Sequence, residues 1–246
     1  MPMSKQEADT FLEDLPRIGR GDSFRFACHP EVACFNRCCA DLDLVLHPYD
    51  VLRLRRALRL AARDFMHRYA EIGIVSGTGF PQVSLRMKAN RRMSCPFVSP
   101  EGCTVYADRP GACRTYPLGR GASLDADGKL EIRYVLVREA HCRGFEEERA
   151  WTVEEWLADQ GLSDYLRFND MHLEFSARLL GEKRTLSREQ SGMVLMALYH
   201  LDEFGERIES GRWLERSHLP DERKRAILND EQARLEFAFE WLESEL

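Results

Sequence analysis

Apolar residues recur at steps of three and four between His47 and Tyr69, which predicts one amphipathic helix over this stretch. Pro48 suits the first turn of a helix, and the carboxylate of Asp50 is favourable near the positive end of the helix dipole. The opposite face is basic and is typical of a solvated surface, with contact to an acidic partner or a phosphate as the alternative. Its residues are Arg53, Arg56, Arg59, Arg63 and Arg68.

The last third of the chain also has helical periodicity. Thr152 and Glu155 have the spacing of a capping box, and Trp151 and Trp156 that of a hydrophobic staple around it. Ser187 and Gln190 repeat the box pattern at the start of another helix. Further helices are expected at Ser163–Leu180, at Asp221–Leu246 and, at the other end of the chain, at Ser4–Leu15.

Between these helical regions the pattern changes to short strands and loops. Strands are expected at Ile72–Val75, Pro81–Met87 and Leu130–Val137, with a turn at Asp125–Lys129 before the last one. The sequence therefore predicts an α+β fold, in which a loop-rich region of short strands precedes a predominantly helical C-terminal region.

Composition and charge narrow the function classes. The 246 residues include 35 Lys and Arg against 41 Asp and Glu, a formal net charge of −6 that argues against a general nucleic-acid binder. No apolar run is long enough to span a membrane, and Met1–Glu7 lacks the apolar core of a signal peptide. We therefore expect a cytoplasmic protein, whose partner, if any, is an unidentified protein.

The cysteines change the picture most. All eight lie between Cys28 and Cys142, and the remaining C-terminal stretch has none. Disulfides are the first alternative, but a reducing cytoplasm disfavours them and favours metal ligation by thiolates. The candidate metal ligands are Cys28, Cys34, Cys38, Cys39, Cys95, Cys103, Cys113 and Cys142.

The spacing of these cysteines excludes the usual zinc modules, because the chain has no Cys-x2-Cys pair. Thiolates from separate loops are compatible with an iron–sulfur cluster, so this is the first choice of cofactor and Zn²⁺ the second. Adjacent Cys38 and Cys39 normally point in different directions. Two sites, or one ligand beside one packed thiol, are therefore the simpler interpretations.

Charged and imidazole side chains flank the cysteines. Four arginines could compensate the negative charge of a thiolate site: Arg37, Arg109, Arg114 and Arg143. His29 and His141 each adjoin a cysteine and are weaker ligand candidates, since eight thiols already suffice for two four-coordinate sites. His47 is interpreted as part of a helix start.

Four motifs together resemble the YkgJ-type cysteine-cluster family. They are Cys38-Cys39, Cys95-Pro96-Phe97-Val98, Gly102-Cys103-Thr104-Val105-Tyr106 and Arg109-Pro110-Gly111-Ala112-Cys113-Arg114-Thr115-Tyr116-Pro117. The resemblance covers about residues 24–145 and implies zinc or iron binding, often as an iron–sulfur protein. The chain departs from the family's compact Cys-x2-Cys-x2-Cys-Cys pattern, because it has five residues between Cys28 and Cys34 and three between Cys34 and Cys38.

The prediction is accordingly a cysteine-rich metal-binding domain at residues 1–145 and a helical region at 146–246 packed on it. The expected function is metal binding, most simply of an iron–sulfur cluster, with redox or cluster-dependent chemistry. The alternatives are a structural zinc protein that acts as an interaction module, and an enzyme similar to a protein lysine N-methylase. No glycine-rich loop of a methyltransferase can be identified, so whether the protein is an enzyme stays open.

Overall fold

A computed structural model describes residues 15–125, 127–181 and 185–246. The chain divides into two compact units, each built from two separate stretches of sequence. The first unit contains Met1–Leu44 and Arg86–Arg167, and the second contains Val45–Leu85 and Phe168–Leu246. The expected division into residues 1–145 and a helical region at 146–246 packed on them stays a prediction. The helix expected at Ser4–Leu15 lies, except for Leu15, outside the described residues.

The first unit combines short strands with short helices. Its strands are β1 (Arg17–Ile18), β2 (Ser23–Arg25), β5 (Val98–Ser99), β6 (Gly102–Cys103), β7 (Leu118–Leu124), β8 (Leu130–Leu136) and β9 (Ala150–Thr152). Its helices are α4 (Gly111–Thr115), α5 (Val153–Asp159) and two 3₁₀ turns at Tyr106–Asp108 and Gly144–Glu146.

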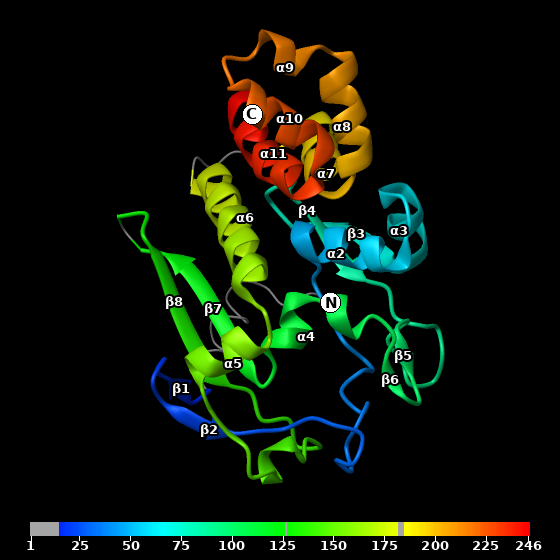
Figure 1. Ribbon diagram of the computed structural model, residues 1–246, viewed down its shortest axis with the longest axis vertical. Helices are drawn as coiled ribbons and strands as arrows, with labels where there is room; N and C mark the ends of the chain where they lie inside the picture. The colour runs from blue at the N-terminus through cyan, green and yellow to red at the C-terminus, as the bar shows by residue number, and fades with distance from the viewer. Residues whose placement is uncertain (1–14, 126, 182–184) are drawn as a thin grey trace. The chain divides into compact units, whose positions relative to one another are not determined.

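Antiparallel pairing organises these strands. β7 and β8 form a long hairpin, and β1 adds to the free side of β8 to give the order β1-β8-β7 (Figure 1). β2 pairs with β9, which joins the N-terminal segment to the chain that follows the last cysteine. Aromatic and aliphatic side chains between these strands and α5 form the core of the unit: Ile18, Phe24, Phe26, Leu118, Tyr134, Trp151, Val153 and Trp156.

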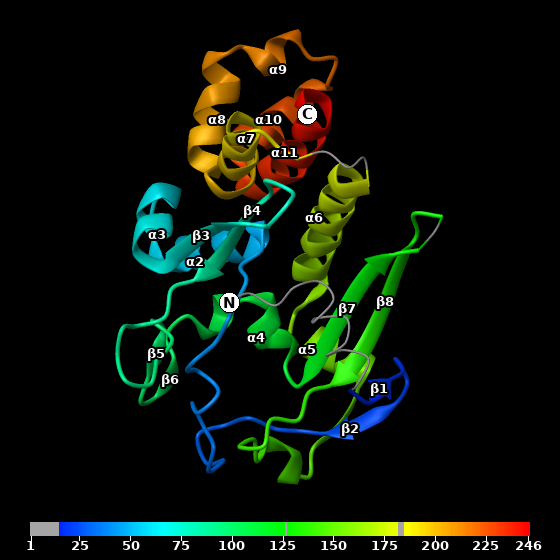
Figure 2. The same cartoon turned by 180° about the vertical axis from the view of Figure 1, so that it is seen from behind.

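The second unit is mainly helical. Its elements are α2 (Pro48–Leu58), α3 (Ala62–Tyr69), β3 (Ala70–Ile74), β4 (Pro81–Leu85), α7 (Arg188–Tyr199), α8 (Leu201–Ser210), α9 (Trp213–Arg216), α10 (Asp221–Asn229) and α11 (Glu231–Glu245). α6 (Ser163–Gly181) begins in the first unit and continues in the second. Helices α7, α8, α10 and α11 pack together as a bundle, seen from behind in Figure 2.

The stretch predicted as one helix from His47 to Tyr69 is two helices. Arg59 adopts a left-handed conformation (φ 54°, ψ 45°) and ends α2, and the N–H of Leu60 donates back to the Arg55 carbonyl at 2.9 Å. α3 then begins at Ala62, whose N–H donates to the Asp202 carboxylate of α8 at 2.9 Å. This cap comes from a distant part of the chain, so a local pattern cannot reveal it.

The stretch predicted as one helix from Asp221 to Leu246 is also divided. Asp230 interrupts it in an extended conformation, and its carboxylate accepts from the amides of Gln232 and Ala233 at 2.7 and 2.9 Å. Asp230 is thus the N-cap of α11. The amphipathic pattern continues across the break and hides it.

Several local predictions are confirmed. Thr152 and Ser187 both close capping boxes, with Glu155 and Gln190 as their partners. The rings of the staple pair, Trp151 and Trp156, lie 5.2 Å apart edge to face. β3, β4 and β8 lie at the predicted strands, within a few residues at each end. The α+β class, with a helical C-terminal region after a cysteine-rich one, is therefore correct.

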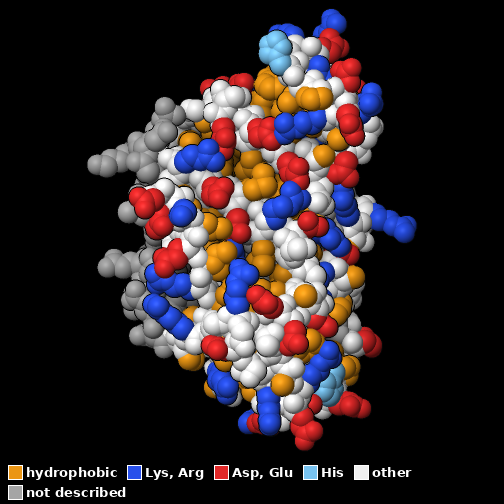
Figure 3. Space-filling model, turned by 60° about the vertical axis from the view of Figure 1, so that its left-hand side comes forward, with side chains coloured by type: hydrophobic (Ala, Val, Ile, Leu, Met, Phe, Trp, Pro, Cys, Tyr) orange, Lys and Arg blue, Asp and Glu red, His pale blue; other side chains and the backbone are white. Residues whose placement is uncertain are grey.

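The surface and the helices also bear on function class. On the face shown in Figure 3, acidic and basic side chains are interspersed with one another and with apolar ones. Across residues 15–125, 127–181 and 185–246, no helix is long and apolar enough to cross a membrane.

Candidate metal centre

All eight cysteines belong to the first unit, although a long stretch of the second unit separates them in sequence. Each is a free thiol, and the structure describes every one of them. They form two groups of four, which differ in the elements that carry them.

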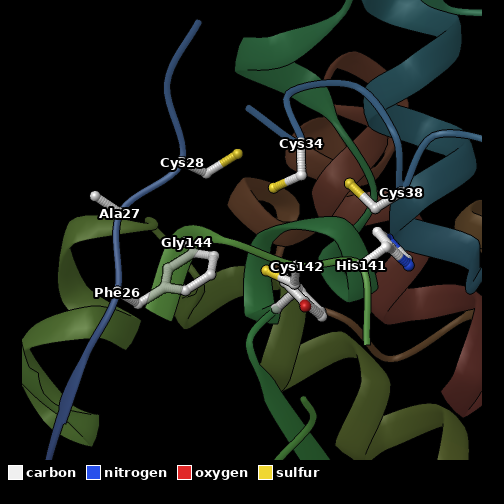
Figure 4. Close-up of a pocket in the computed structure, with 9 residues that line it drawn as sticks. Phe26, Ala27, Cys28, Cys34, Cys38, His141, Cys142 and Gly144 are labelled. Atoms are coloured by element: carbon white, nitrogen blue, oxygen red, sulfur yellow. The ribbon is translucent and has the colours of Figure 1, made fainter. Parts of the chain in front are cut away.

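The first thiol group consists of Cys28, Cys34, Cys38 and Cys142, which line one small cavity (Figure 4). The sulfurs of Cys28 and Cys34 point toward one another, and that of Cys38 points toward Cys34. The other lining residues are Phe26, Ala27, Tyr116, His141 and Gly144. The enclosed volume is about 30 Å³, and the lining is almost entirely carbon and sulfur. The cavity therefore brings four sulfur atoms, which are soft metal ligands, together in an apolar environment.

Successive turns compact the segment that carries three of these thiols. The amides of Val32, Phe35 and Arg37 each donate to the carbonyl three residues earlier, at 3.0, 2.8 and 2.9 Å. Asn36 adopts a positive φ of 64°, and its side-chain amide donates to the Ser99 carbonyl at 2.9 Å. These turns therefore bring Cys28, Cys34 and Cys38 close together despite the wide spacing between them in the sequence.

Gly144 allows the segment that follows Cys142 to pack closely against the segment that precedes Cys28. The N–H of Ala27 donates to the Gly144 carbonyl at 3.0 Å. A Cβ at Gly144 would stand 2.6 Å from both the Ala27 oxygen and the Phe26 ring. Only glycine permits this approach, so Gly144 positions Cys142 beside Cys28.

The second thiol group consists of Cys39, Cys95, Cys103 and Cys113. The N–H of Cys95 donates to the Cys39 carbonyl at 2.9 Å, and Ala40 bridges to Ser94 beside it. Cys103 ends β6 and pairs with Val98 of β5, whose N–H donates to the Cys95 carbonyl at 3.3 Å. Cys113 lies in α4. The hairpin and the bridge bring Cys39, Cys95 and Cys103 together, and Cys113 lies within electrostatic reach of Cys39.

The titration of the thiols reflects this crowding. Burial, followed by the neighbouring Cys38, Cys34 and Cys142, raises the pKa of Cys28 to about 11. A hydrogen bond from the Cys39 thiol lowers the pKa of Cys38 to about 7. The same bond, with burial and with Cys38, Cys95 and Cys113 nearby, raises the pKa of Cys39. The neighbouring thiols make it costly for Cys28 and Cys39 to ionise, and a bound metal ion would offset this cost by stabilising the thiolates.

Tyr116 stands out in the sequence only as part of a motif, yet it lines the first cavity. Burial, followed by the neighbouring Cys142 sulfur, raises the pKa of its hydroxyl. Phe26 and Gly144 carry no recognisable chemical signal in the sequence. Their roles depend on a close approach between distant segments.

The arginines that flank the cysteines have different roles. The Arg109 guanidinium lies within electrostatic reach of Cys28, Cys103 and Cys113. Arg114 instead donates to the carbonyls of Arg109, Gln160 and Ala107, so it holds backbone together. Arg109 also donates to the Tyr106 carbonyl and to the Gln160 side chain, and its charge near the three thiols is what fits the predicted compensating role.

Arg143 and Arg37 do not offer their side-chain charge in the same way. The Arg143 guanidinium pairs with Glu146 at 2.8 Å, while its backbone N–H donates to the Cys34 sulfur at 3.1 Å. The Arg37 side chain is exposed to solvent. Arg143 therefore contacts a thiol through its backbone and not through its charge.

The two flanking histidines lie differently from the sulfurs. The Nε2 atom of His29 contacts the Glu147 carboxylate at 3.2 Å. His141 lines the first cavity, but its ring is turned away from the Cys28 and Cys142 sulfurs (Figure 4). Its Nε2 is buried and has no hydrogen-bond partner in the described part of the chain. His47 is the N-cap of α2, as predicted.

The thiols are gathered but do not converge on one point. Within the residues that the structure describes, no three His, Cys, Asp or Glu side chains are already placed to hold a single ion. Four sulfurs on one apolar cavity nevertheless form the donor set that zinc and iron–sulfur clusters use. The residues therefore fit a thiolate-bound metal, and binding it requires the sulfurs to move closer or to span several metal atoms.

Comparison with known proteins adds one match. No curated protein and no solved structure matches the chain. A family model named CxxCxxCC and described as "Putative zinc- or iron-chelating domain" matches residues 27–149, which is half of the chain and contains all eight cysteines. With its thiols gathered in this stretch, the chain belongs to the CxxCxxCC family of zinc- or iron-chelating domains.

Proposed function

We propose that this member of the family binds its metal through the cysteine thiolates and that the metal is an iron–sulfur cluster. The observation that carries the proposal is the set of four thiols around one apolar cavity, with four more thiols in the same unit. A cluster distributes its thiolates over several iron atoms, so it needs wider sulfur spacing than one ion does.

Backbone donors support the thiolate form. The N–H of Arg143 donates to the Cys34 sulfur, and the amides of Phe97 and Val98 donate to the Cys95 sulfur. Amide-to-sulfur hydrogen bonds stabilise negative charge on the ligand and tune the potential of a bound cluster. Both thiol groups contain such a donor. When bound, a cluster would supply one-electron transfer.

The second candidate is a structural zinc protein that acts as an interaction module. It is favoured by the enclosed volume of the first cavity, about 30 Å³, which suits one ion better than a core of several iron and sulfur atoms. Zn²⁺ holds four thiolates at about 2.3 Å in a closed tetrahedron. In that case the metal would order the loops and carry no electrons.

Anaerobic purification distinguishes the two candidates. The full chain is analysed for iron, zinc and acid-labile sulfide, and its visible spectrum is recorded before and after dithionite. Iron with matching sulfide and a broad visible absorption band that bleaches supports the cluster, whereas colourless protein with zinc and no sulfide supports the second candidate. Protein that binds neither metal, even after reconstitution with iron and sulfide or with zinc, overturns both.

A further inference from the structure

We infer that the eight thiols form two separate metal sites, one made by Cys28, Cys34, Cys38 and Cys142 and the other by Cys39, Cys95, Cys103 and Cys113. This inference rests on the proposed function, because it assigns the ligands of the metal that the function requires. Each site would take one zinc ion or one iron–sulfur cluster.

The adjacent pair Cys38 and Cys39 divides the two groups. Cys38 lines the first cavity with Cys28, Cys34 and Cys142, and Cys39 is not among the residues lining it. The Cys39 carbonyl instead accepts from the N–H of Cys95 at 2.9 Å. The Cys39 thiol donates a hydrogen bond to the Cys38 sulfur, so the adjacent pair supplies one thiol to each group and holds the two groups in contact. The pair is therefore a junction between two sites.

Separate backbone supports hold the two groups. The first group closes through the hydrogen bond between Ala27 and Gly144 and through the amide of Arg143 on Cys34. The second closes through the bridge of Ala40 with Ser94 and the pairing of Val98 with Cys103. Each of these four contacts belongs to one group, and the Asn36 side chain links the segment of the first group to Ser99 of β5.

The numbers of donors also divide evenly. Four thiolates complete the coordination of one zinc ion or of one four-iron cluster, and each group offers four. The Arg109 guanidinium, which donates to the Tyr106 carbonyl, lies within electrostatic reach of members of both groups. A single four-ligand site would leave the four thiols of the other group without a role.

Metal content of paired variants tests the inference. Cys142→Ser removes a ligand from the first group and Cys103→Ser from the second, and Ser210→Ala, at an exposed position of α8 in the second unit, is a control that keeps all eight thiols. Each serine variant is expected to lose the metal of its own group and keep that of the other, so total metal falls to about half. The control is expected to keep all of its metal.

Double variants show whether two ligands belong to one site. Cys38→Ser combined with Cys142→Ser should bind as much metal as either single variant, because both act on one group. Cys38→Ser combined with Cys103→Ser should bind none. Circular dichroism of each variant verifies folding, and a variant that fails to fold is replaced by serine at another cysteine of the same group.

The possible failures are distinguishable. If the unaltered chain binds metal but Cys142→Ser and Cys103→Ser each remove all of it, one site uses both groups and the inference is overturned while the proposed function stands. The same holds if either variant keeps the full content. If the unaltered chain binds no metal, the proposed function itself fails.

Discussion

The backbone N–H of Arg143 donates to the Sγ atom of Cys34 at 3.1 Å, between residues 109 apart in sequence. This contact joins the segment after Cys142 to the coil that holds the earlier thiols, and it supplies a neutral donor to a sulfur. The side chain of Arg143 pairs with Glu146 instead. The residue therefore serves the thiols through its main chain, which any residue other than proline preserves.

The two arginines should consequently respond differently to the same substitution. Arg143→Gln is expected to keep its metal, whereas Arg109→Gln removes the guanidinium near Cys28, Cys103 and Cys113 and should weaken metal affinity by about 10- to 100-fold. Competition with a chromophoric chelator measures both affinities. Arg109→Lys separates charge from hydrogen bonding, and equal affinities for Arg109→Gln and Arg143→Gln would remove the compensating role.

Gly144→Ala should destabilise the first unit. The added Cβ would stand 2.6 Å from the Ala27 oxygen and the Phe26 ring, so the free energy of unfolding should fall by about 1–3 kcal/mol. Gly192 is the matched control, since it lies exposed in α7 and a Cβ added there would meet nothing within 4 Å. Gly192→Ala should stabilise by about 0.5–1 kcal/mol. Urea unfolding measures both, and a stable Gly144→Ala protein with full metal content would show that the segment can shift.

Cys38 should be the fastest thiol to react in the metal-free chain. The hydrogen bond from Cys39 lowers the pKa of Cys38 to about 7, whereas burial raises the pKa of Cys28 to about 11. The thiolate is the nucleophile, so alkylation of Cys38 by iodoacetamide should rise through about pH 7 and precede that of Cys28. Peptide mass spectrometry identifies the order. Cys39→Ala removes the donor and should slow the reaction of Cys38 at neutral pH.

Removal of metal should unfold the loops before the helices. Coordination bonds take the place of an extensive hydrogen-bonded ladder in the cysteine-bearing segments, while α7, α8 and α11 pack against one another. Hydrogen exchange after chelation should lose protection first across residues 28–39 and 95–113. Unchanged exchange there in metal-free protein would mean that the loops are ordered without the ligand.

His172 should make the second unit sensitive to acid. Burial and the facing His47 lower the pKa of His172 to about 3, and the rings of Phe80 and Phe239 also pack against it. Below about pH 6.5 the unfolded chain takes up a proton that the folded chain refuses until about pH 3. As the pH decreases across this window, the free energy of unfolding should therefore decrease by about 1.4 kcal/mol for each pH unit.

A comparison of two histidine variants isolates that contribution. His172→Phe should flatten the slope of stability against pH between about 3 and 6.5, while His218→Gln, a change at a solvent-accessible residue, should leave it unaltered. Chemical unfolding at several pH values supplies the slopes. An unchanged slope in His172→Phe would assign the acid sensitivity to other groups.

Local signals in the sequence predict those parts of the fold that local interactions determine. The capping boxes at Thr152 and Ser187 and the staple of Trp151 and Trp156 each depend on residues close to one helical turn. The break between α2 and α3 escapes prediction because Asp202 caps α3 from another helix. The interleaved units cannot be predicted from local signals for a similar reason, because each unit is assembled from two stretches that are far apart in the sequence.

The candidate site divides in the same way. The identities of the eight cysteines can be read from the sequence alone, whereas the expectation that Cys38 and Cys39 point apart does not anticipate the hydrogen bond between their thiols. The grouping of the cysteines cannot be read in this way, because it depends on the pairing of β2 with β9 and of Ala27 with Gly144, which brings Cys142 to the cavity. Arg114 is a residue whose position in the sequence suggests a role at the site that its side chain does not have. It adjoins Cys113 in sequence, yet its guanidinium holds carbonyl groups.

The interleaving of the units has a consequence for synthesis on the ribosome. Cys28, Cys34 and Cys38 emerge early, but the fourth member of their group, Cys142, follows only after the whole of Val45–Leu85 has been made. At about 5–20 residues per second, the delay between Cys38 and Cys142 is roughly 5–20 s. During that interval three thiols are translated without their last neighbour. Completion of the first group is therefore a late event in the life of the nascent chain, and whatever delivers the metal must act after more than half of the protein has been made.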